Sequence, residues 1–320
     1  MKILITGATG FIGQHLTKAL IKSGHWVTVF CRSPQKALVL KKFGARLSMG
    51  NIKDYQNIKN AVKDNQVIFH LAATLAAHKA QEKKYFQVNV LGTKNILEAS
   101  KNVKLFVHTS SVGIYGPTSL KGKTENSSRH PTDIYSKTKL EGENLVWQKI
   151  KKGFPAIIIR PTLVYGPGDR TSGMANLISA IGKRRFIIPG SGQNFFHTLY
   201  IDNLIQAYLL CLDKKKAIGK DFNIGDQEAS PLKELVYEIA KAQDVPPPPL
   251  VPKALLIPPT LIFDILEKIG LPAPLTSYQL NFLTQNRTFP IKKAQKVLGY
   301  RPKVALSQGI EKTVKWLKEK

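Results

Sequence analysis

The chain has 320 residues, of which 43% are apolar and 22% charged, a balance that excludes a disordered, collagen-like or disulfide-stapled protein. Its 48 basic and 21 acidic side chains leave a net charge of +27. Only nine of the basic residues are arginines, and the lysines are spread over many segments. A solvated lysine-rich surface is therefore favoured over nucleic-acid binding, while an anionic cofactor or an acidic membrane surface stays compatible with the charge.

The cysteines and the apolar stretches bear on the compartment. Cys31 and Cys211 form no CxxC pair, so the sequence predicts neither a disulfide framework nor a thiolate zinc site and fits a cytoplasmic protein. The apolar stretch 251–270 is broken by Pro258, Pro259 and Asp264, which makes it too short and too polar to span a bilayer. We expect no transmembrane helix, and we expect the first residues to belong to the fold and not to a targeting signal.

Short β-branched runs alternate with helical patterns through the first half of the chain, which is typical of a parallel sheet wrapped by helices. A long helix is expected over 133–151, opened by Asp133. The predicted fold is α/β, a Rossmann-type doubly wound parallel sheet with a smaller, mostly helical C-terminal substrate lobe. The expected strands are 2–6, 26–31, 45–49, 66–72, 104–110 and 156–161.

The pattern loosens after residue 165, where glycine- and proline-rich stretches appear. Strand and helix character returns later, so the chain is expected to re-enter the first lobe before it finishes in the second. The four prolines at 246–249 form a stiff connector that precedes a helical tail, 253–320. The predicted division is a dinucleotide-binding domain of residues 1–165 and 198–226, and a substrate lobe of residues 166–197 and 227–320.

A glycine-rich turn, GATGFIG at 7–13, follows the first expected strand and opens a helix. Glycines at such a turn let backbone amides approach a pyrophosphate, and the helix N-terminus favours the anion. The strand-turn-helix context makes this pattern moderately specific for a dinucleotide. The turn lacks the GK[ST] ending of a nucleoside-triphosphate loop.

The end of the second strand bears on which dinucleotide is bound. A carboxylate at this place normally holds the ribose 2′-hydroxyl of NAD, but this chain has Cys31 and Arg32 there, followed by Ser33 and Lys36. A guanidinium would attract a 2′-phosphate, so NADP is favoured over NAD. The alternative is that Arg32 stacks on adenine or faces water.

Two further segments contain candidate acid–base groups. Tyr135 and Lys139 are four residues apart on the expected helix, so both side chains emerge on one face. An ammonium beside a phenol stabilises the phenolate, so Lys139 is expected to lower the pKa of Tyr135. Ser110 and Ser111 follow the fifth strand, where they could hydrogen-bond a substrate oxygen at the carboxyl edge of the sheet.

At this point the sequence resembles the extended short-chain dehydrogenases/reductases, also called the NAD-dependent epimerase/dehydratase family. The resemblance covers nearly the whole chain, and jointly its motifs are highly specific. They occur in the family's order and spacing: GATGFIG, HLAA (70–73), VNVLGTKNILEA (88–99), HTSSVGIYG (108–116), YSKTKLEGE (135–143) and RPTLVYGPGD (160–169).

The resemblance implies roles for individual residues. Ser111 takes the place of the catalytic serine or threonine, Tyr135 that of the general acid/base, and Lys139 that of the lysine that lowers its pKa and holds the nicotinamide ribose. Thr138 stands where a serine is common, and Asn51 where an aspartate often precedes the adenine-contacting residue. The implied cofactor-binding set is Gly7, Thr9, Gly10, Phe11, Ile12, Gly13, Arg32, Asn51, Ile52, Leu71, Ala72, Ala73, Asn89, Tyr135, Lys139 and Pro161.

The histidines offer no metal site. His70 and His108 lie in or at the ends of expected buried strands, and they are interpreted as hydrogen-bonded structural groups. The sequence contains no HExxH motif, so we predict no catalytic metal.

The family resemblance implies hydride exchange with a nicotinamide, proton transfer by Tyr135 and orientation of the substrate oxygen by Ser111. The second lobe resembles the 3β-hydroxysteroid dehydrogenase and dihydroflavonol reductase branches, which favours a hydrophobic alcohol or ketone. The apolar segment 250–283 is interpreted either as the lining of that site or as ordinary helix packing.

Two other functions stay open. The first is a nucleotide-sugar 4-epimerase or dehydratase, in which Arg184, Arg185 and Arg287 clamp a diphosphate. The second, of another class, is a non-catalytic NADP sensor or membrane-surface binding protein. The small-molecule substrate itself is not identified by the sequence, and the resemblance implies a homodimer.

Overall fold

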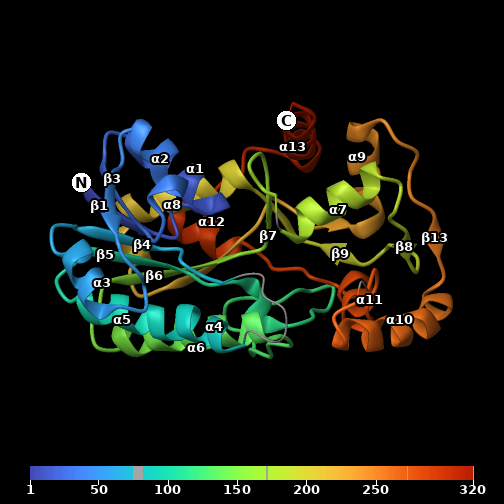
Figure 1. Cartoon of the computed structure of the whole chain (residues 1–320), viewed down its shortest axis with the longest axis horizontal. Helices are drawn as coiled ribbons and strands as arrows, with labels where there is room; N and C mark the ends of the chain where they lie inside the picture. The colour runs from blue at the N-terminus through green and yellow to red at the C-terminus, as the bar shows by residue number, and fades with distance from the viewer. Residues whose placement is uncertain (75–81, 171, 272, 320) are drawn as a thin grey trace.

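A computed structural model describes residues 1–74, 82–170, 172–271 and 273–319. Its centre is a seven-stranded sheet in the order β11-β6-β5-β4-β1-β2-β3 (Figure 1), and every pairing in it is parallel. The predicted α/β doubly wound fold is confirmed. The strands are β1 (Lys2–Thr6), β2 (Trp26–Cys31), β3 (Arg46–Met49), β4 (Val67–His70), β5 (Leu105–Thr109), β6 (Ala156–Pro161) and β11 (Asp221–Ile224).

The strand order reverses between β1 and β4, because the chain builds one half of the sheet outward from β1 and the other half outward from β4. Ligands of doubly wound folds bind outside the carboxyl ends of the strands at such a reversal. The glycine turn after β1 and the segment after β4 lie side by side at the carboxyl ends of these two strands. The fold therefore directs attention to the edge formed by the ends of β1, β4 and β5.

Helices cover both faces of the sheet (Figure 1), and alternate residues of each strand pack against opposite layers. Ile3 and Ile5 of β1 face one core and Leu4 faces the other. The first layer holds α1 (Phe11–Lys22), α2 (Pro34–Lys42) and α8 (Ile201–Asp213). The second holds α3 (Tyr55–Val62), α5 (Gly92–Ala99) and α6 (Ile134–Ile150), with α4 (Glu82–Tyr85) and the π-helix η2 (Phe86–Leu91) leading into α5.

The long helix expected over 133–151 is α6. Asp133 is its N-cap, and the Asp133 carboxylate accepts a hydrogen bond of 2.8 Å from the backbone N–H of Ser136. Such a cap satisfies one of the amides that the first turn leaves without a partner. The cap fixes where the helix begins and therefore how Tyr135, in its first turn, approaches the sheet.

The remaining elements include three two-stranded pairs, β10-β7, β12-β9 and β13-β8. The strands of these pairs are only two or three residues long. The elements are η3 (Val112–Tyr115), β7 (Leu163–Tyr165), α7 (Gly173–Gly182), β8 (Ile188–Pro189), β9 (Phe195–Phe196), β10 (Thr198–Tyr200), η4 (Lys215–Ala217), β12 (Ser230–Pro231), α9 (Leu232–Gln243), β13 (Leu250–Val251), α10 (Lys253–Lys268), α11 (Ser277–Thr284), α12 (Lys292–Leu298) and α13 (Leu306–Lys318).

The prolines of the apolar stretch 251–270 do not interrupt it as a helix. Pro258 and Pro259 lie inside α10, near its N-terminal end. Each proline removes one backbone donor and frees the carbonyl four residues before it. Those carbonyls belong to Ala254 and Leu255, which are exposed, so water can satisfy them. In the described part of the chain, none of the helices combines the length and the hydropathy needed to cross a bilayer.

Candidate functional site

The glycine turn after β1 is shaped so that backbone can come close to a ligand. Gly7 has a φ of +75°, and a Cβ built on it would lie 2.7 Å from the backbone nitrogen of Ala72. A Cβ on Gly13 would lie 2.3 Å from the carbonyl oxygen of Gly7. Either position therefore excludes a side chain. Gly10 precedes α1, and among the described residues no side chain caps this helix end. The turn fits the pyrophosphate of a dinucleotide, which the free amides of α1 would hold.

The segment that follows β4 forms a wall beside this turn. Its backbone N–H groups at Leu71 and Ala72 donate to the carbonyl and the hydroxyl of Thr6, at 3.1 and 3.3 Å. Asn89, buried in η2, accepts a hydrogen bond of 2.8 Å from the backbone of Thr74. These bonds hold the chain after β4 next to the glycine turn, where the sequence places the wall of a cofactor site.

Asn89 also reaches the helix that holds the candidate acid. Its side-chain amide donates to the hydroxyl of Thr138 on α6 at 3.0 Å, and the Thr138 hydroxyl donates to the carbonyl of Tyr135 at 2.9 Å. The threonine that replaces the family's usual serine therefore supplies the same kind of hydroxyl. Asn89 links the wall after β4 to the first turns of α6.

Ser111, Tyr135 and Lys139 converge beyond the carboxyl end of β5. Ser111 caps η3, and its hydroxyl accepts from the backbone N–H of Gly113 at 3.1 Å. The Ser111 hydroxyl also lies close enough to the phenol of Tyr135 to lower its pKa. The buried Lys139 donates from Nζ to the carbonyl oxygen of Thr109 at 2.5 Å. A substrate oxygen placed between the serine and tyrosine hydroxyls could therefore exchange a proton with one and be oriented by the other.

Burial governs the protonation of this group. It raises the pKa of Tyr135 above its ordinary value, the Ser111 hydrogen bond opposes that rise, and the carboxylate of Asp133 adds to it. Burial also lowers the pKa of Lys139 to about 8, against the opposing effect of Glu143. Lys139 is not among the groups that shift this pKa, so the expectation that it lowers the pKa of Tyr135 is not met. Burial of the phenolate dominates instead. At neutral pH Tyr135 is a neutral phenol.

The family assignment follows from comparison with known proteins. The model of the NAD dependent epimerase/dehydratase family matches residues 3–225, which include the glycine turn and all three converging residues. The chain belongs to this family. Its members are NAD-dependent oxidoreductases, epimerases and dehydratases, so the chain is an enzyme of this kind.

Individual relatives span nearly the whole chain. A 3beta-hydroxysteroid-dehydrogenase/decarboxylase, isoform 1, of Arabidopsis thaliana is 29% identical over 97% of this chain and 78% of its own length. A 2-alkyl-3-oxoalkanoate reductase of Stenotrophomonas maltophilia is 28% identical over 98% of both chains. Among solved structures, a UDP-glucuronic acid 4-epimerase of Bacillus cereus in complex with NAD has a TM-score of 0.81 and 27% identity, and the match covers 100% of this chain and 97% of the other.

The remaining candidate residues of this family member lie around the same edge of the sheet. Arg32 is exposed directly after β2, and Asn51, after β3, accepts from the backbone N–H of Lys53 at 3.1 Å. Ile52 is buried against Gly92, where a Cβ would lie 3.0 Å from the isoleucine. The others take these places: Thr9, Phe11 and Ile12 around the start of α1, Ala73 after β4, and Pro161 at the end of β6.

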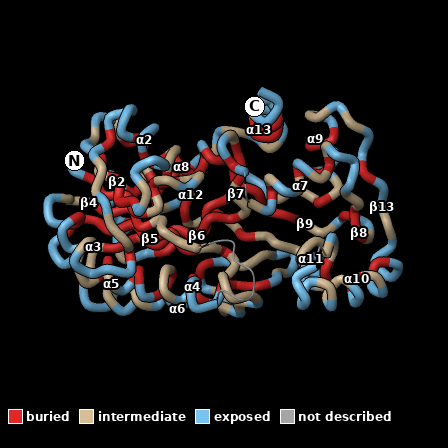
Figure 2. The backbone as a smooth tube through the Cα atoms, viewed as in Figure 1, coloured by how far each residue is buried: buried red, intermediate tan, exposed pale blue. Residues whose placement is uncertain are grey.

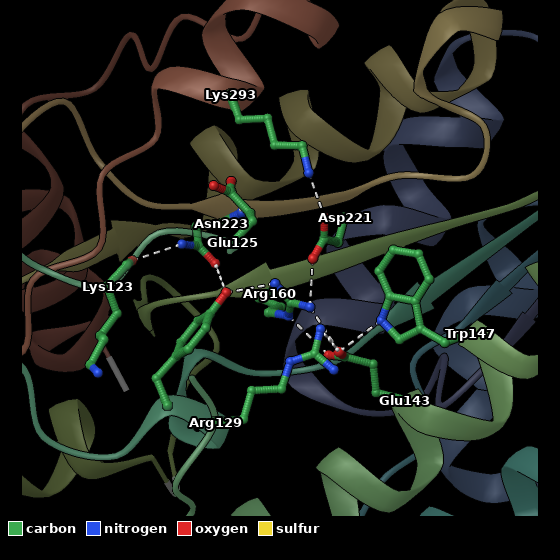
Figure 3. Close-up of polar contacts among 10 residues, drawn as sticks. Lys123, Glu125, Arg129, Glu143, Trp147, Arg160, Asp221, Asn223 and Lys293 are labelled. Atoms are coloured by element: carbon green, nitrogen blue, oxygen red, sulfur yellow. Dashed lines mark hydrogen bonds and ion pairs between the residues drawn. The ribbon is translucent and has the colours of Figure 1, made fainter. Parts of the chain in front are cut away.

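A buried ionic network that the sequence analysis did not identify supports α6 (Figure 3). Glu143, one turn beyond Lys139, accepts two hydrogen bonds from Arg160 of β6, at 2.9 and 2.8 Å. Arg160 also contacts Asp221 of β11 at 2.6 Å and donates to the Tyr115 hydroxyl at 2.6 Å. The pKa of Glu143 lies below its ordinary value, because hydrogen bonds and charge from Arg160 outweigh the effect of burial.

The network extends to the second half of the chain. Lys293 of α12 contacts Asp221 at 2.5 Å, and Asn223 of β11 accepts from the Tyr115 hydroxyl at 3.0 Å. Figure 3 shows Glu143 of α6 and Asp221 of β11 contacting Arg160 of β6, and Lys293 of α12 contacting Asp221. One sequence signal could have revealed it: an arginine directly after the apolar run Ile157–Ile159 of a buried strand requires an acidic partner.

The two buried histidines differ. His70 is hydrogen-bonded at both ring nitrogens, to Thr6 at 2.7 Å and Thr93 at 3.0 Å. His108 lies beside it in β5, and neither of its ring nitrogens has a hydrogen-bond partner among the described residues. The interpretation of both as hydrogen-bonded groups is therefore wrong for His108. Across the residues that the structure describes, no cluster of His, Cys, Asp and Glu could hold a metal ion.

These histidines predict a loss of stability in acid. Burial lowers the pKa of His70 from 6.5 to about 3 and that of His108 well below 6.5, with Lys139 adding to both effects. Below pH 6.5 the unfolded chain binds protons that the folded chain does not, so the free energy of unfolding falls as pH drops from 6.5 toward 3. Each histidine contributes a slope of about 1.4 kcal/mol per pH unit.

Urea unfolding of wild type and His108→Met at several pH values measures this slope. The variant is expected to be about 1 to 3 kcal/mol more stable near neutral pH, because an unpaired buried polar group is removed, and to lose the contribution of His108 to the acid slope. The exposed His130, replaced in the same way, is the control. An unchanged acid slope in His108→Met would contradict the assignment.

Proposed function

We propose that the protein is an NAD(P)-dependent oxidoreductase of the extended short-chain dehydrogenase type that transfers a hydride to or from a hydrophobic alcohol or ketone. The observation that carries this proposal is the proximity of Ser111 to Tyr135 on the helix that also holds the buried Lys139, at the carboxyl end of β5. When bound in the cradle after β1, the nicotinamide cofactor supplies or accepts the hydride.

The protonation state of Tyr135 in the cofactor-free protein suits ketone reduction better than alcohol oxidation. A neutral Tyr135 phenol is the form that can donate a proton to the oxygen of a ketone, while Ser111 holds that oxygen. Alcohol oxidation requires the phenolate, which burial disfavours. Lys139, with a pKa of about 8, is held against the Thr109 carbonyl, and it can supply positive charge on the same helix face as the phenol. We propose these as the roles of the three residues.

A hydrophobic substrate is supported by what lies next to Tyr135. The Tyr278 hydroxyl of α11 donates to Asp133, the N-cap of α6, at 3.4 Å. Phe282, one turn along α11, packs near Tyr278 and Phe196, with ring centroids 6.4 and 5.8 Å apart. An aromatic cluster is therefore connected to the start of the helix that holds the acid. The Arabidopsis and Stenotrophomonas relatives, named for steroid and alkyl-oxoalkanoate substrates, support the same class.

The nucleotide-sugar alternative has one residue in its favour. The Arg287 guanidinium lies 3.7 Å from the ring centre of Phe282, and it interacts with Tyr278 and Asp133, so a cation does stand near the start of α6. Arg184 and Arg185 instead occupy the exposed turn between α7 and β8. A clamp of all three arginines is not proposed, and a single cation supports a diphosphate only weakly.

Net use of cofactor separates the candidate functions. The purified protein is mixed with NADPH or NADH and, in turn, with a 3-oxosteroid and a 2-alkyl-3-oxoalkanoate, and separately with NAD⁺ and a UDP-sugar, and the absorbance of reduced nicotinamide is followed. Steady oxidation with an apolar ketone supports the proposal. Conversion of the UDP-sugar without net change in nicotinamide supports the epimerase. Cofactor binding with no turnover of any substrate would favour the non-catalytic sensor.

We propose that NADP is preferred over NAD, on the basis of the exposed Arg32 and the missing carboxylate after β2. The prediction is that Arg32→Ala weakens NADPH binding about tenfold or more, since it removes a charge-assisted contact to the 2′-phosphate, and leaves NADH binding nearly unchanged. Fluorescence titration of both cofactors measures this. Arg46→Ala, an exposed arginine of β3, is the matched control, and an equal loss for both cofactors would show that Arg32 contacts something other than the phosphate.

We further propose residues 1–165 and 198–226 as the dinucleotide-binding domain, and residues 166–197 and 227–320 as the substrate lobe. The pairing of β11 with β6 in the central sheet supports the return of the chain to the first unit. A homodimer in the cytoplasm is proposed from the family resemblance and from two cysteines that are free and buried. Light scattering of the purified protein tests the dimer.

A further inference from the structure

One helix of the protein turns its apolar side outward. Along α10 and the residues after it, large apolar side chains stand in water, and α10 lies at the periphery of the molecule (Figures 1 and 2). These side chains are Leu255, 67% exposed, Leu261, 57%, Ile262, 60%, Ile265, 61%, and Ile269, 65%. With 100° between successive residues, they occupy one broad face. The amphipathic pattern of a surface helix is therefore reversed here.

The inner side of α10 is polar where it meets α11. Thr260 is buried, and its hydroxyl lies 3.2 Å from that of Ser277. The carboxylate of Asp264 accepts from the backbone N–H of Ser277 at 2.9 Å. Glu267, three residues after Asp264, continues this polar row. Because these bonds fix which side of α10 faces α11, the outward position of the apolar face is set by the fold.

The outward face is long and free of acidic charge. From Leu255 to Ile269 it extends about 21 Å along the helix axis. All 16 residues of α10 are described, and neither of its acids lies on this face: Asp264 is in the inner row, and the exposed Glu267 lies on the same side of the helix as Asp264. Lys253 and Lys268 stand at the two ends of α10. Apolar surface of this extent marks a site of contact with something apolar.

We propose that the outward face of α10 docks on the surface of an anionic lipid bilayer. The apolar side chains enter the region between headgroups and acyl chains, and the terminal lysines meet lipid phosphates. The net charge of +27 supports this occupant, because a positively charged protein is drawn to an anionic surface. A second copy is not the proposed occupant of this face, because it would bring the terminal lysines of both α10 helices together.

Docking in this way would bring the proposed catalytic group close to lipid. The helix next to α10 is α11, whose Tyr278 reaches Asp133 at the start of α6. If the proposed function holds, an apolar substrate could pass from the bilayer along α11 to Tyr135. This consequence rests on the proposed function, whereas the docking itself does not.

Vesicle binding of the full-length protein, without cofactor or substrate, tests the proposal. The protein is sedimented with vesicles of phosphatidylcholine mixed with phosphatidylglycerol, and with vesicles of phosphatidylcholine alone. Wild type is expected to bind the mixed vesicles at least about tenfold more tightly than the neutral ones, and added salt should weaken binding, since surface charge is screened. The double variant Ile262→Glu/Ile265→Glu should bind at least about tenfold more weakly, because two charges enter the apolar face.

The control is Leu120→Glu, an exposed leucine outside α10 that is 68% exposed, and it should bind like wild type. Circular dichroism and urea unfolding confirm that both variants fold. Equal binding by the double variant, or no binding of wild type to either vesicle, would overturn the proposal. So would a dimer in light scattering that the double variant dissociates, because α10 would then join two copies. Turnover of a water-soluble ketone tests the proposed function separately.

Discussion

Replacing Tyr135 by phenylalanine is expected to reduce kcat for ketone reduction by about 10²- to 10⁴-fold, the usual contribution of a positioned general acid. The change deletes one hydroxyl, which lies near Ser111, and keeps the ring in its place. It leaves the glycine turn and the wall after β4 untouched, so the Kd of the reduced cofactor should change little. Steady-state kinetics and fluorescence titration on the same preparation measure the two quantities.

The matched control is Tyr237→Phe in α9, a partly exposed tyrosine remote from the sheet edge, which should retain wild-type kcat. Ser111→Ala should lower kcat less than Tyr135→Phe, because it removes the group that orients the substrate oxygen and leaves the proton donor. A Tyr135→Phe variant with unchanged turnover would eliminate the proposed proton donor. If its biological output were also unchanged, the non-catalytic alternative would replace the enzyme.

The pH dependence of reduction follows from the same burial. Since the pKa of Tyr135 is raised, the phenol stays protonated through the neutral and mildly alkaline range. Lys139, with a pKa of about 8, changes charge inside that range. A decline of kcat above pH 8 would therefore report deprotonation of Lys139. The free energy of unfolding, measured without cofactor near neutral pH, should show no such decline.

Much of this fold was predictable because its strands are read directly from local pattern. The runs 26–31 and 156–159 are β-branched or apolar throughout, as strands buried on both faces require, and they lie in β2 and β6, whose bounds are the expected ones. Asp133 is a capping residue three positions before Ser136, and the helix begins there. The converging residues were found because a linear motif holds them at fixed spacing from such elements.

Other features depend on what surrounds a residue, and spacing alone does not supply that. Tyr135 and Lys139 are correctly placed one turn apart, yet the pKa of the phenol moves upward because burial is set by the whole fold. The apolar segment 250–283 offered lining or packing as alternatives, and neither describes the exposed face of α10. The orientation of α10 depends on hydrogen bonds from Asp264 and Thr260 to Ser277 of the next helix, α11.

The network around Arg160 shows the same limit and gives the largest expected effect on stability. Its members come from η3, α6, β6, β11 and α12, which are far apart in the sequence. Only the assembled sheet therefore identifies the partners of Arg160. Arg160→Met is expected to lower the free energy of unfolding by about 3 to 5 kcal/mol, because it leaves Glu143 and Asp221 buried without the guanidinium between them. Urea unfolding measures the loss, provided that the slope of the unfolding free energy against urea concentration is the same in variant and wild type.

The control lies on the same helix. Glu141 of α6 is exposed, two residues before the buried Glu143, and Glu141→Gln should change stability by no more than about 0.5 kcal/mol. Adding Glu143→Gln to Arg160→Met should recover part of the loss, since the buried carboxylate, left with the partly exposed Arg129 at 3.3 Å as its ion-pair partner, becomes a neutral amide. Losses that simply add would show that the pair is not coupled.

The dependence on pH separates lost charge pairing from lost packing. In wild type the pKa of Glu143 is below 4.5, so its stabilising contribution is present above pH 4.5 and disappears as pH falls through the folded-state value. Without Arg160, burial should raise the pKa of Glu143 above its unfolded value, so the folded variant would hold a proton that the unfolded chain releases. The deficit of Arg160→Met relative to wild type should therefore grow as pH rises from 5 to 7.5. A deficit that stays constant over that range would instead mean that the methionine fails only to fill the volume of the arginine.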